Sequence, residues 1–63
     1  MTLDQGIAGH TYIVETLNLA LGMIVSKPVD VLNNKNGGTM IIKVRNTRLA
    51  IGRGISSRIV VRS

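Results

Sequence analysis

Sixty-three residues suffice for one domain, expected here to span residues 1–63, and a chain this short buries only about 60% of its unfolded surface. Because the chain has no cysteine and a single aromatic residue, disulfides and thiolate-bound metals are excluded and the core must be aliphatic. The net charge of +5 favours an acidic partner: nucleic acid, an anionic membrane surface or an acidic protein surface.

No targeting or membrane-spanning segment is predicted. Asp4 comes early, and Gly6 and Gly9 interrupt the apolar residues near the start, so the pattern of a signal peptide is missing. The longest apolar run, LALGMIV, is far shorter than the roughly 20 residues that a membrane helix needs. We therefore expect a soluble protein, and the lack of cysteine fits a reducing cytoplasm.

The first predicted strand covers residues 9–15, GHTYIVE. Tyr12 and Val14 share one face, and the alternate residues share the other. Because both faces carry apolar side chains, the periodicity leaves open which of them is buried.

Residues 16–23, TLNLALGM, have two alternative interpretations. A short helix would begin at Thr16, end at Gly22 and place Leu17 and Leu21 on one side. Barely two turns of helix are not stable alone and would depend on the packing of these leucines. The alternative is an extended connection.

The next two strands are predicted at residues 28–32, PVDVL, and 39–45, TMIIKVR. In the first, the two valines face inward and Asp30 faces outward. In the second, Met40 and the apolar residues at alternate positions after it face inward. Both segments therefore read as half-buried strands.

The loop between these strands allows two registers. Asn36-Gly37 is a strong signal for a type I′ hairpin turn, and it would pair Val31 with Ile42. A six-residue loop over residues 33–38 would instead pair Val31 with Met40. Both registers keep the apolar face inward, so the pattern does not choose between them.

A two-residue turn at Asn46-Thr47 is predicted to lead into a strand at residues 48–51, RLAI. This register sets Arg45 opposite Arg48 on the outer face, where like charges are mildly unfavourable unless water screens them or an anionic group lies between them. The inner pairs would be Val44 with Leu49 and Ile42 with Ile51.

The chain is predicted to end with a turn, or one 3₁₀ turn, at residues 52–57 and a strand at residues 58–62 with Ile59 and Val61 inward. Five short strands with tight hairpins favour a mainly all-β fold with at most one short helix. A closed barrel is expected, since closure removes the exposed edges that a flat sheet of this size would have.

The order of these pieces resembles the ferrous iron transport protein A (FeoA) family. The resemblance covers nearly the whole chain, from the opening TLDQ through LGM to VDVLNNKNGGTMIIKVRNTRLAIGRGISSRIVV, and the stretch from Leu21 to Val61 carries it best. It implies a small SH3-like five-stranded barrel in the bacterial cytoplasm. It also implies an accessory role beside the membrane ferrous iron transporter, which carries a cytosolic GTP-binding region.

Two features depart from the family pattern. The helical insertion that usually precedes the Leu-Gly element shrinks here to TLNLAL and contains no arginine. Asn46 stands where the family often has glycine. Because asparagine tolerates the left-handed region best among non-glycine residues, we expect the turn to survive.

Residues for metal binding or catalysis are few. The possible ligands His10, Asp4, Glu15 and Asp30 form no pair at a known ligand spacing, so no metal or cofactor is expected. No nucleophile can be placed beside His10, and the three serines near the end, Ser56, Ser57 and Ser63, lack an activating context. The glycine pairs and the GRG stretch do not match a phosphate-binding loop. We expect a protein that is not an enzyme.

The expected function is that of an adaptor of ferrous iron uptake that binds the transporter's cytosolic GTP-binding region. One rival is a small basic barrel that binds nucleic acid, although Tyr12 alone makes a poor stacking platform. Another is a free-standing repressor-type interaction domain. The candidate contact residues are Leu21, Met23, Arg45, Arg48 and Arg53.

Overall fold

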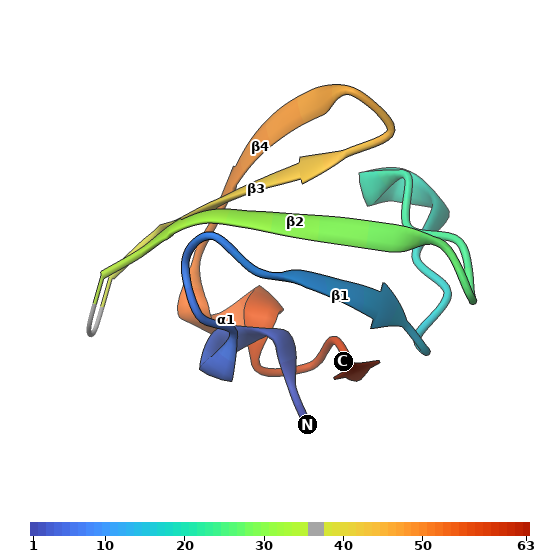
Figure 1. The fold of residues 1–63 in the computed structure, drawn as a ribbon, viewed down its shortest axis with the longest axis horizontal. Helices are drawn as coiled ribbons and strands as arrows, with labels where there is room; N and C mark the ends of the chain where they lie inside the picture. The colour runs from blue at the N-terminus through green and yellow to red at the C-terminus, as the bar shows by residue number, and fades with distance from the viewer. Residues whose placement is uncertain (36–37) are drawn as a thin grey trace.

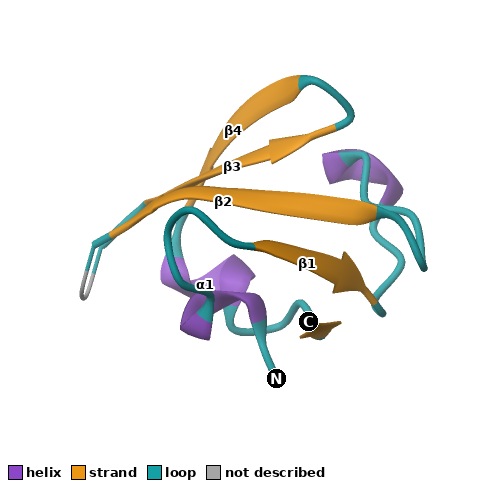
Figure 2. Cartoon of the chain, viewed as in Figure 1, coloured by secondary structure: helices purple, strands orange, loops and turns teal. Residues whose placement is uncertain are grey.

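Five antiparallel strands form one sheet in the order β4-β3-β2-β1-β5 in the computed structural model, which describes residues 1–35 and 38–63 (Figures 1 and 2). The strands are β1 (Thr11–Val14), β2 (Pro28–Asn34), β3 (Met40–Val44), β4 (Thr47–Ile51) and β5 (Val61–Arg62). Three short helices accompany them: 3₁₀ helices η1 (Leu3–Gln5) and η2 (Leu19–Leu21) and a single α-helical turn, α1 (Arg53–Ser56). The predicted set of five strands is thus confirmed, with β5 shorter than expected.

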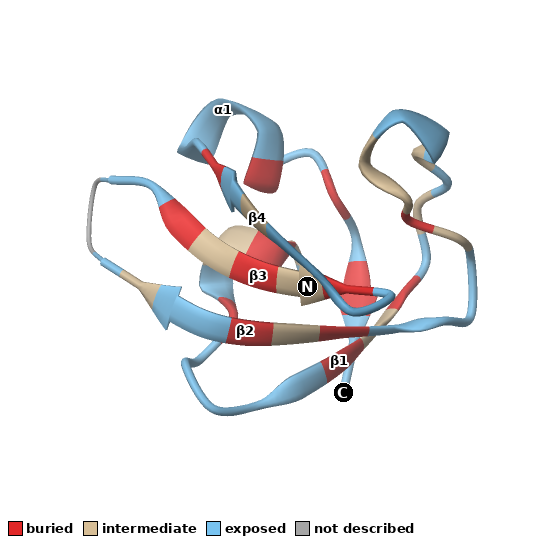
Figure 3. Ribbon diagram, turned by 90° about the horizontal axis from the view of Figure 1, so that it is seen from above, coloured by how far each residue is buried: buried red, intermediate tan, exposed pale blue. Residues whose placement is uncertain are grey.

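The sheet curls around an aliphatic core, as expected for an SH3-like barrel. Tyr12 and Val14 face inward, which settles the question that periodicity left open for β1. The inward faces predicted for the other strands are confirmed as well (Figure 3). The core residues are Leu3, Tyr12, Val14, Met23, Val29, Val31, Met40, Ile42, Val44, Ile51, Ile59 and Val61.

The hairpin of β2 and β3 pairs Val31 with Ile42, the register predicted for a two-residue turn. The residues predicted to form this turn, Asn36 and Gly37, lie outside the described residues. A β-bulge at Leu32 then shifts the pairing, so that Asn34 lies opposite Met40. This shift brings the Asn34 side chain to the first segment of the chain, where its amide donates to two backbone carbonyls, those of Asp4 and Gly6, at 2.9 and 2.7 Å.

The predicted register of β3 and β4 was wrong by two residues. Val44 pairs with Thr47, and Lys43 rather than Arg45 lies opposite Arg48. The turn consists of Arg45 and Asn46, with φ values of 52° and 68°. Positive φ at both central residues is the requirement of a type I′ turn, and it is costly for a β-branched residue such as Thr47. Inward residues stay inward because the shift moves β4 by two positions.

The predicted SH3-like barrel fold is confirmed. Strand pairing does not close it as expected, because β4 and β5 are edges that do not pair with each other in the described part of the chain. The β5 edge is covered by the first residues of the chain (Figure 1). Thr2 bridges Val60, and the backbone of Met1 accepts a hydrogen bond of 2.8 Å from the Val61 amide. In the described part of the chain, the outer edge of β4 has no such cover.

Within residues 16–23, Leu19–Leu21 form the 3₁₀ helix η2. The helical alternative is therefore the closer one, but its details differ. Asn18, not Thr16, caps the helix, and Gly22 ends it at a φ of 75°. The Thr16 hydroxyl instead accepts a hydrogen bond from the Val60 amide. Leu17, expected to pack, is 59% exposed.

Candidate functional site

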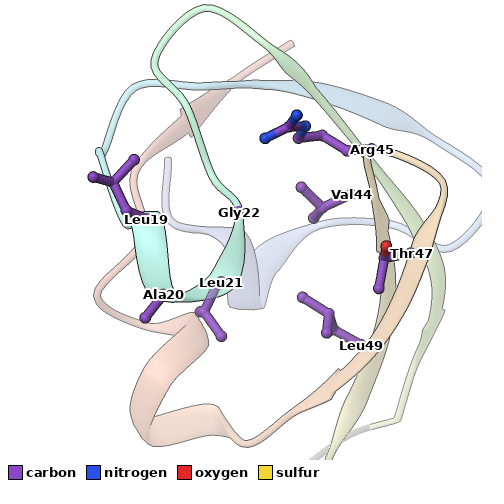
Figure 4. Close-up of a pocket in the computed structure, with 8 residues that line it drawn as sticks. All are labelled: Leu19, Ala20, Leu21, Gly22, Val44, Arg45, Thr47 and Leu49. Atoms are coloured by element: carbon purple, nitrogen blue, oxygen red, sulfur yellow. The ribbon is translucent and has the colours of Figure 1, made fainter.

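A shallow groove of about 460 Å³ lies between η2 and the hairpin of β3 and β4 (Figure 4). Its walls come from two segments that are distant in sequence, and the side chains of Leu21 and Leu49 point toward each other across it. Both leucines are only half-buried and pack on the edge of the core. The lining residues are Leu19, Ala20, Leu21, Gly22, Val44, Arg45, Thr47 and Leu49.

Hydrogen bonds at both ends hold η2 in place. The Asn18 side chain accepts from the Leu21 amide at 3.3 Å, and the backbones of Asn18 and Met23 exchange two hydrogen bonds of 3.0 and 2.8 Å. Met23 is fully buried and anchors the segment in the core. This short closed loop leaves no room to bury all its leucines, so Leu19 is 72% exposed at the groove.

Arg45 lies where this groove meets a second one. The second groove, of about 330 Å³, is lined by Ile24, Lys27, Pro28 and Arg45. The Arg45 guanidinium therefore stands at the mouth of an apolar surface, with Lys27 nearby along the same side of the molecule. Arg45 belongs to the turn between β3 and β4, and its side chain points from there toward the side of η2 (Figure 4).

On the outer face of the sheet, the charged side chains at the β3 and β4 end of a cross-strand row are basic. On the outer face, Thr11, Asp30, Lys43 and Arg48 form a row across β1 to β4 through successive pairs. Asp30 accepts a hydrogen bond from the Thr11 hydroxyl at 2.6 Å, and Arg48 stands at the far end of the row, on the edge strand. In residues 1–35 and 38–63, the one ion pair within 4.0 Å joins Arg62 to Glu15.

Comparison with known proteins identifies the family of this chain and a solved structure with the same fold. The family model described as the FeoA domain matches residues 1–63. The chain belongs to the FeoA domain family. A crystal structure described as an iron uptake regulatory protein (FeoA) superimposes with a TM-score of 0.88 at 27% identity, covering 98% of this chain and 95% of that one. No curated protein matches significantly by sequence.

The structure brings together only part of the set of contact residues predicted from sequence. Leu21 and Arg45 line the same groove of this FeoA domain. Arg48 is exposed on β4, and Arg53 is exposed at the start of α1 but does not line the groove. Met23, also predicted as a contact residue, is fully buried in the core and is not exposed to a partner in this structure.

Sequence reasoning missed two leucines of the groove, Leu19 and Leu49. The spacing of Leu17 and Leu21 suggested an α-helical face, whereas η2 is a 3₁₀ turn that exposes Leu19 instead. Three leucines in five positions of so short a connection were a usable signal, since a stub cannot bury all of them. Leu49 was assigned only to the core, but the edge position of β4 leaves it half-buried.

The residues considered for metal binding lie apart in this FeoA domain. His10 is exposed and its ring stacks on Tyr12 at 6.4 Å between centroids, while Glu15 pairs with Arg62 and Asp30 with Thr11. Over the described ranges, no three His, Asp or Glu side chains gather as a metal ion would need. Nor does any helix there have the length and apolar character to cross a membrane.

Proposed function

We propose that this chain is a non-enzymatic accessory protein of ferrous iron uptake that works in the cytoplasm by binding the cytosolic part of the membrane ferrous iron transporter. Membership of the FeoA domain family and the similarity to an iron uptake regulatory protein support the pathway. The groove between η2 and the hairpin of β3 and β4 supports a binding role. It is the observation that carries the proposal.

The surface of the groove combines two properties of a protein-binding site. Leu21 and Leu49 inside the groove are only half-buried, and Leu19 at its rim is exposed and points outward from η2 (Figure 4). These apolar side chains gain by being covered. Arg45 at its mouth is an anchor of the kind enriched at interface centres. An acidic or mixed acidic and apolar surface is the complementary partner.

Nucleic-acid binding is less well supported by the structure. Tyr12, the single aromatic residue of the chain, is buried, and its hydroxyl accepts a hydrogen bond from the Ile7 amide at 2.9 Å. It therefore offers no face on which a base can stack. The five arginines are spread over the turn between β3 and β4, the edge strand β4, the start of α1, the turn after α1 and β5, rather than along one groove.

The test is a binding measurement with the purified cytosolic GTP-binding region of the ferrous iron transporter from the same genome. We expect the unmodified chain to bind, and the double variant Arg45→Glu, Arg48→Glu to bind about tenfold or more weakly. The matched control is Lys35→Glu, Arg58→Glu, which changes the net charge equally. Lys35 follows Asn34, which pairs with Met40 at the end of β3 away from the groove residues Val44 and Arg45.

The outcomes separate the alternatives. Absence of binding by the unmodified chain would contradict the proposed function. Equal weakening by both double variants would remove the two arginines from the interface and leave only a general effect of charge. Single-stranded nucleic acid, bound tightly at near-physiological salt, would favour the rival function.

A further inference from the structure

We propose that the partner adds an extended segment to the free edge of β4, with acidic side chains toward Arg48 and Arg45 and an apolar side chain in the groove. This inference rests on the proposed function and specifies the chemistry of the contact. The occupant is a strand of the transporter's cytosolic region.

The backbone of β4 has unused hydrogen-bonding groups on its outer edge. In a two-residue hairpin, the pair flanking the turn exchanges both backbone hydrogen bonds, and such pairs alternate with pairs that exchange none. Val44 and Thr47 flank the turn, so Lys43–Arg48 and Ile41–Ala50 are the pairs without mutual bonds. The N–H and C=O groups of Arg48 and Ala50 therefore point away from β3, and within the described residues no other segment bonds to them.

Of the two edges of this sheet, the one at β5 is covered by the chain itself, and the one at β4 is not covered by any described residue. The first residues of the chain pair with the β5 side through Thr2 and Val60, which satisfies that edge internally. Nothing comparable covers β4 in the described part of the chain, although exposed edges invite pairing with another chain. Peptide recognition by strand addition uses edges of this kind, with pockets beside them for alternate side chains.

The groove lies where such a pocket is needed. A strand added to β4 would direct its side chains alternately to the two faces of the sheet. On the inner side, residues next to Leu49 would enter the groove, whose other wall is η2 with Leu21, while the Leu19 side chain points outward from η2 at the rim (Figure 4). On the outer side they would lie beside Arg48, for which no carboxylate within the described residues forms an ion pair.

Charge identifies the partner as acidic and argues against a second copy of this chain. All three carboxylates already have partners: Asp4 accepts from Thr2, Glu15 pairs with Arg62, and Asp30 accepts from Thr11. Pairing β4 with β4 of a second molecule would bring Arg48 of each near the other, between two chains that each carry a net charge of +5. Like charges across a ladder are unfavourable.

The experiment measures amide hydrogen exchange by NMR on the full chain, alone and saturated with the transporter's cytosolic GTP-binding region. We expect the Arg48 and Ala50 amides to exchange about tenfold or more slowly in the complex. Ala50→Pro removes one outward donor at a position where an edge strand tolerates proline, and should weaken binding about tenfold. Ala50→Val, which keeps the amide, should bind as the unmodified chain does.

Each result bears on the inference. Binding at full strength with unprotected Arg48 and Ala50 amides would overturn strand addition while leaving the proposed function intact. Protection of these amides in the free chain that rises with its own concentration would show that the edge self-associates, and would also overturn it. If the unmodified chain does not bind at all, both proposals fall. If Ala50→Pro does not fold, the exchange data on the unmodified chain still decide.

Discussion

At the scale of single residues, Arg45 has a backbone conformation that is unfavourable for its residue type. It sits at a φ of 52°, a region where Asn or Gly would be comfortable and where other L-residues pay about 1–2 kcal/mol. Its neighbour Asn46, at 68°, is suited to the same region. Backbone strain of this kind persists most often where the side chain is needed for function.

A strained backbone combined with a side chain used for binding predicts opposite effects of Arg45→Gly: higher stability and weaker binding. Relief of the strain, less the greater flexibility of glycine in the unfolded chain, should raise stability by about 0.5–1 kcal/mol. Thermal unfolding should show a melting temperature higher by about 2–8 °C, while binding to the transporter's cytosolic region weakens. The control is Arg58→Gly, since Arg58 is exposed and its φ is not positive. Equal shifts in the two variants would show that Arg45 is not strained.

Gly6 offers a second prediction at this scale. A Cβ there would lie 2.9 Å from the Val31 side chain and 3.0 Å from the Leu3 carbonyl oxygen, so Gly6→Ala forces the core or the backbone to shift. Overpacking of this kind costs about 1–3 kcal/mol. Gly54→Ala, with no atom near its Cβ, should be neutral or raise stability by up to about 1 kcal/mol. Denaturant unfolding of both variants is the measurement, and a Gly6→Ala midpoint equal to that of the unmodified chain would contradict the packing.

At the scale of elements, the segment before β1 is a structural part of the sheet. The Leu3 side chain is fully buried, and the Leu3 amide donates to the Ile59 carbonyl at 2.7 Å. Leu3→Ala should therefore cost about 2–5 kcal/mol, a large part of the roughly 3–9 kcal/mol expected for a chain of this size. Leu19→Ala, the same change at an exposed position, should alter stability by less than about 0.5 kcal/mol.

Urea unfolding followed by circular dichroism compares these two leucine variants directly. A Leu3→Ala variant with the midpoint of Leu19→Ala would mean that the first residues do not seal the β5 edge in solution. A large loss in Leu19→Ala would instead make η2 part of the core rather than a wall of the groove.

The elements also show how far the sequence could specify this fold. Alternation of apolar residues predicted all five strands and the inward faces of β2, β3 and β4, because period two survives any shift of register by two. For the same reason, it could not decide the register of β4 against β3. The decisive term was local: Thr47 resists the positive φ that Arg45 and Asn46 accept. The bulge at Leu32 had no signal in the alternation.

The candidate site was less accessible from the sequence than the fold, for a physical reason. The groove depends on which side chains the packed core leaves outside, and this is a property of the assembled surface. Arg45 could be proposed from its turn, but the exposure of Leu19 and the burial of Met23 depend on how the short segment around η2 packs on the core, which the residue pattern does not specify.

At the scale of the whole molecule, the two edges of the sheet differ: the N-terminal segment covers the β5 edge, whereas the β4 edge is uncovered in the described residues and carries basic side chains. The N-terminal segment closes the β5 side, and both chain ends lie there, away from η2 (Figure 1). The β4 side combines the free strand edge, the apolar groove and the Arg45 and Arg48 side chains. A partner approaching this side meets long-range attraction first and apolar contact afterwards.

This order of events predicts that charge and apolar contact act on different rate constants of binding to the transporter's cytosolic region. Arg45→Glu with Arg48→Glu should lower the association rate constant by about tenfold at low salt, and an unmodified chain should lose a similar factor as salt is raised. Leu19→Ser should mainly speed dissociation, because covered apolar area is lost only after contact. Ile7→Ser is the matched control, since Ile7 is 61% exposed on the loop before β1. Surface plasmon resonance at two ionic strengths separates the two rate constants, and a Leu19→Ser variant that dissociates no faster than Ile7→Ser would place the apolar contact elsewhere on the molecule.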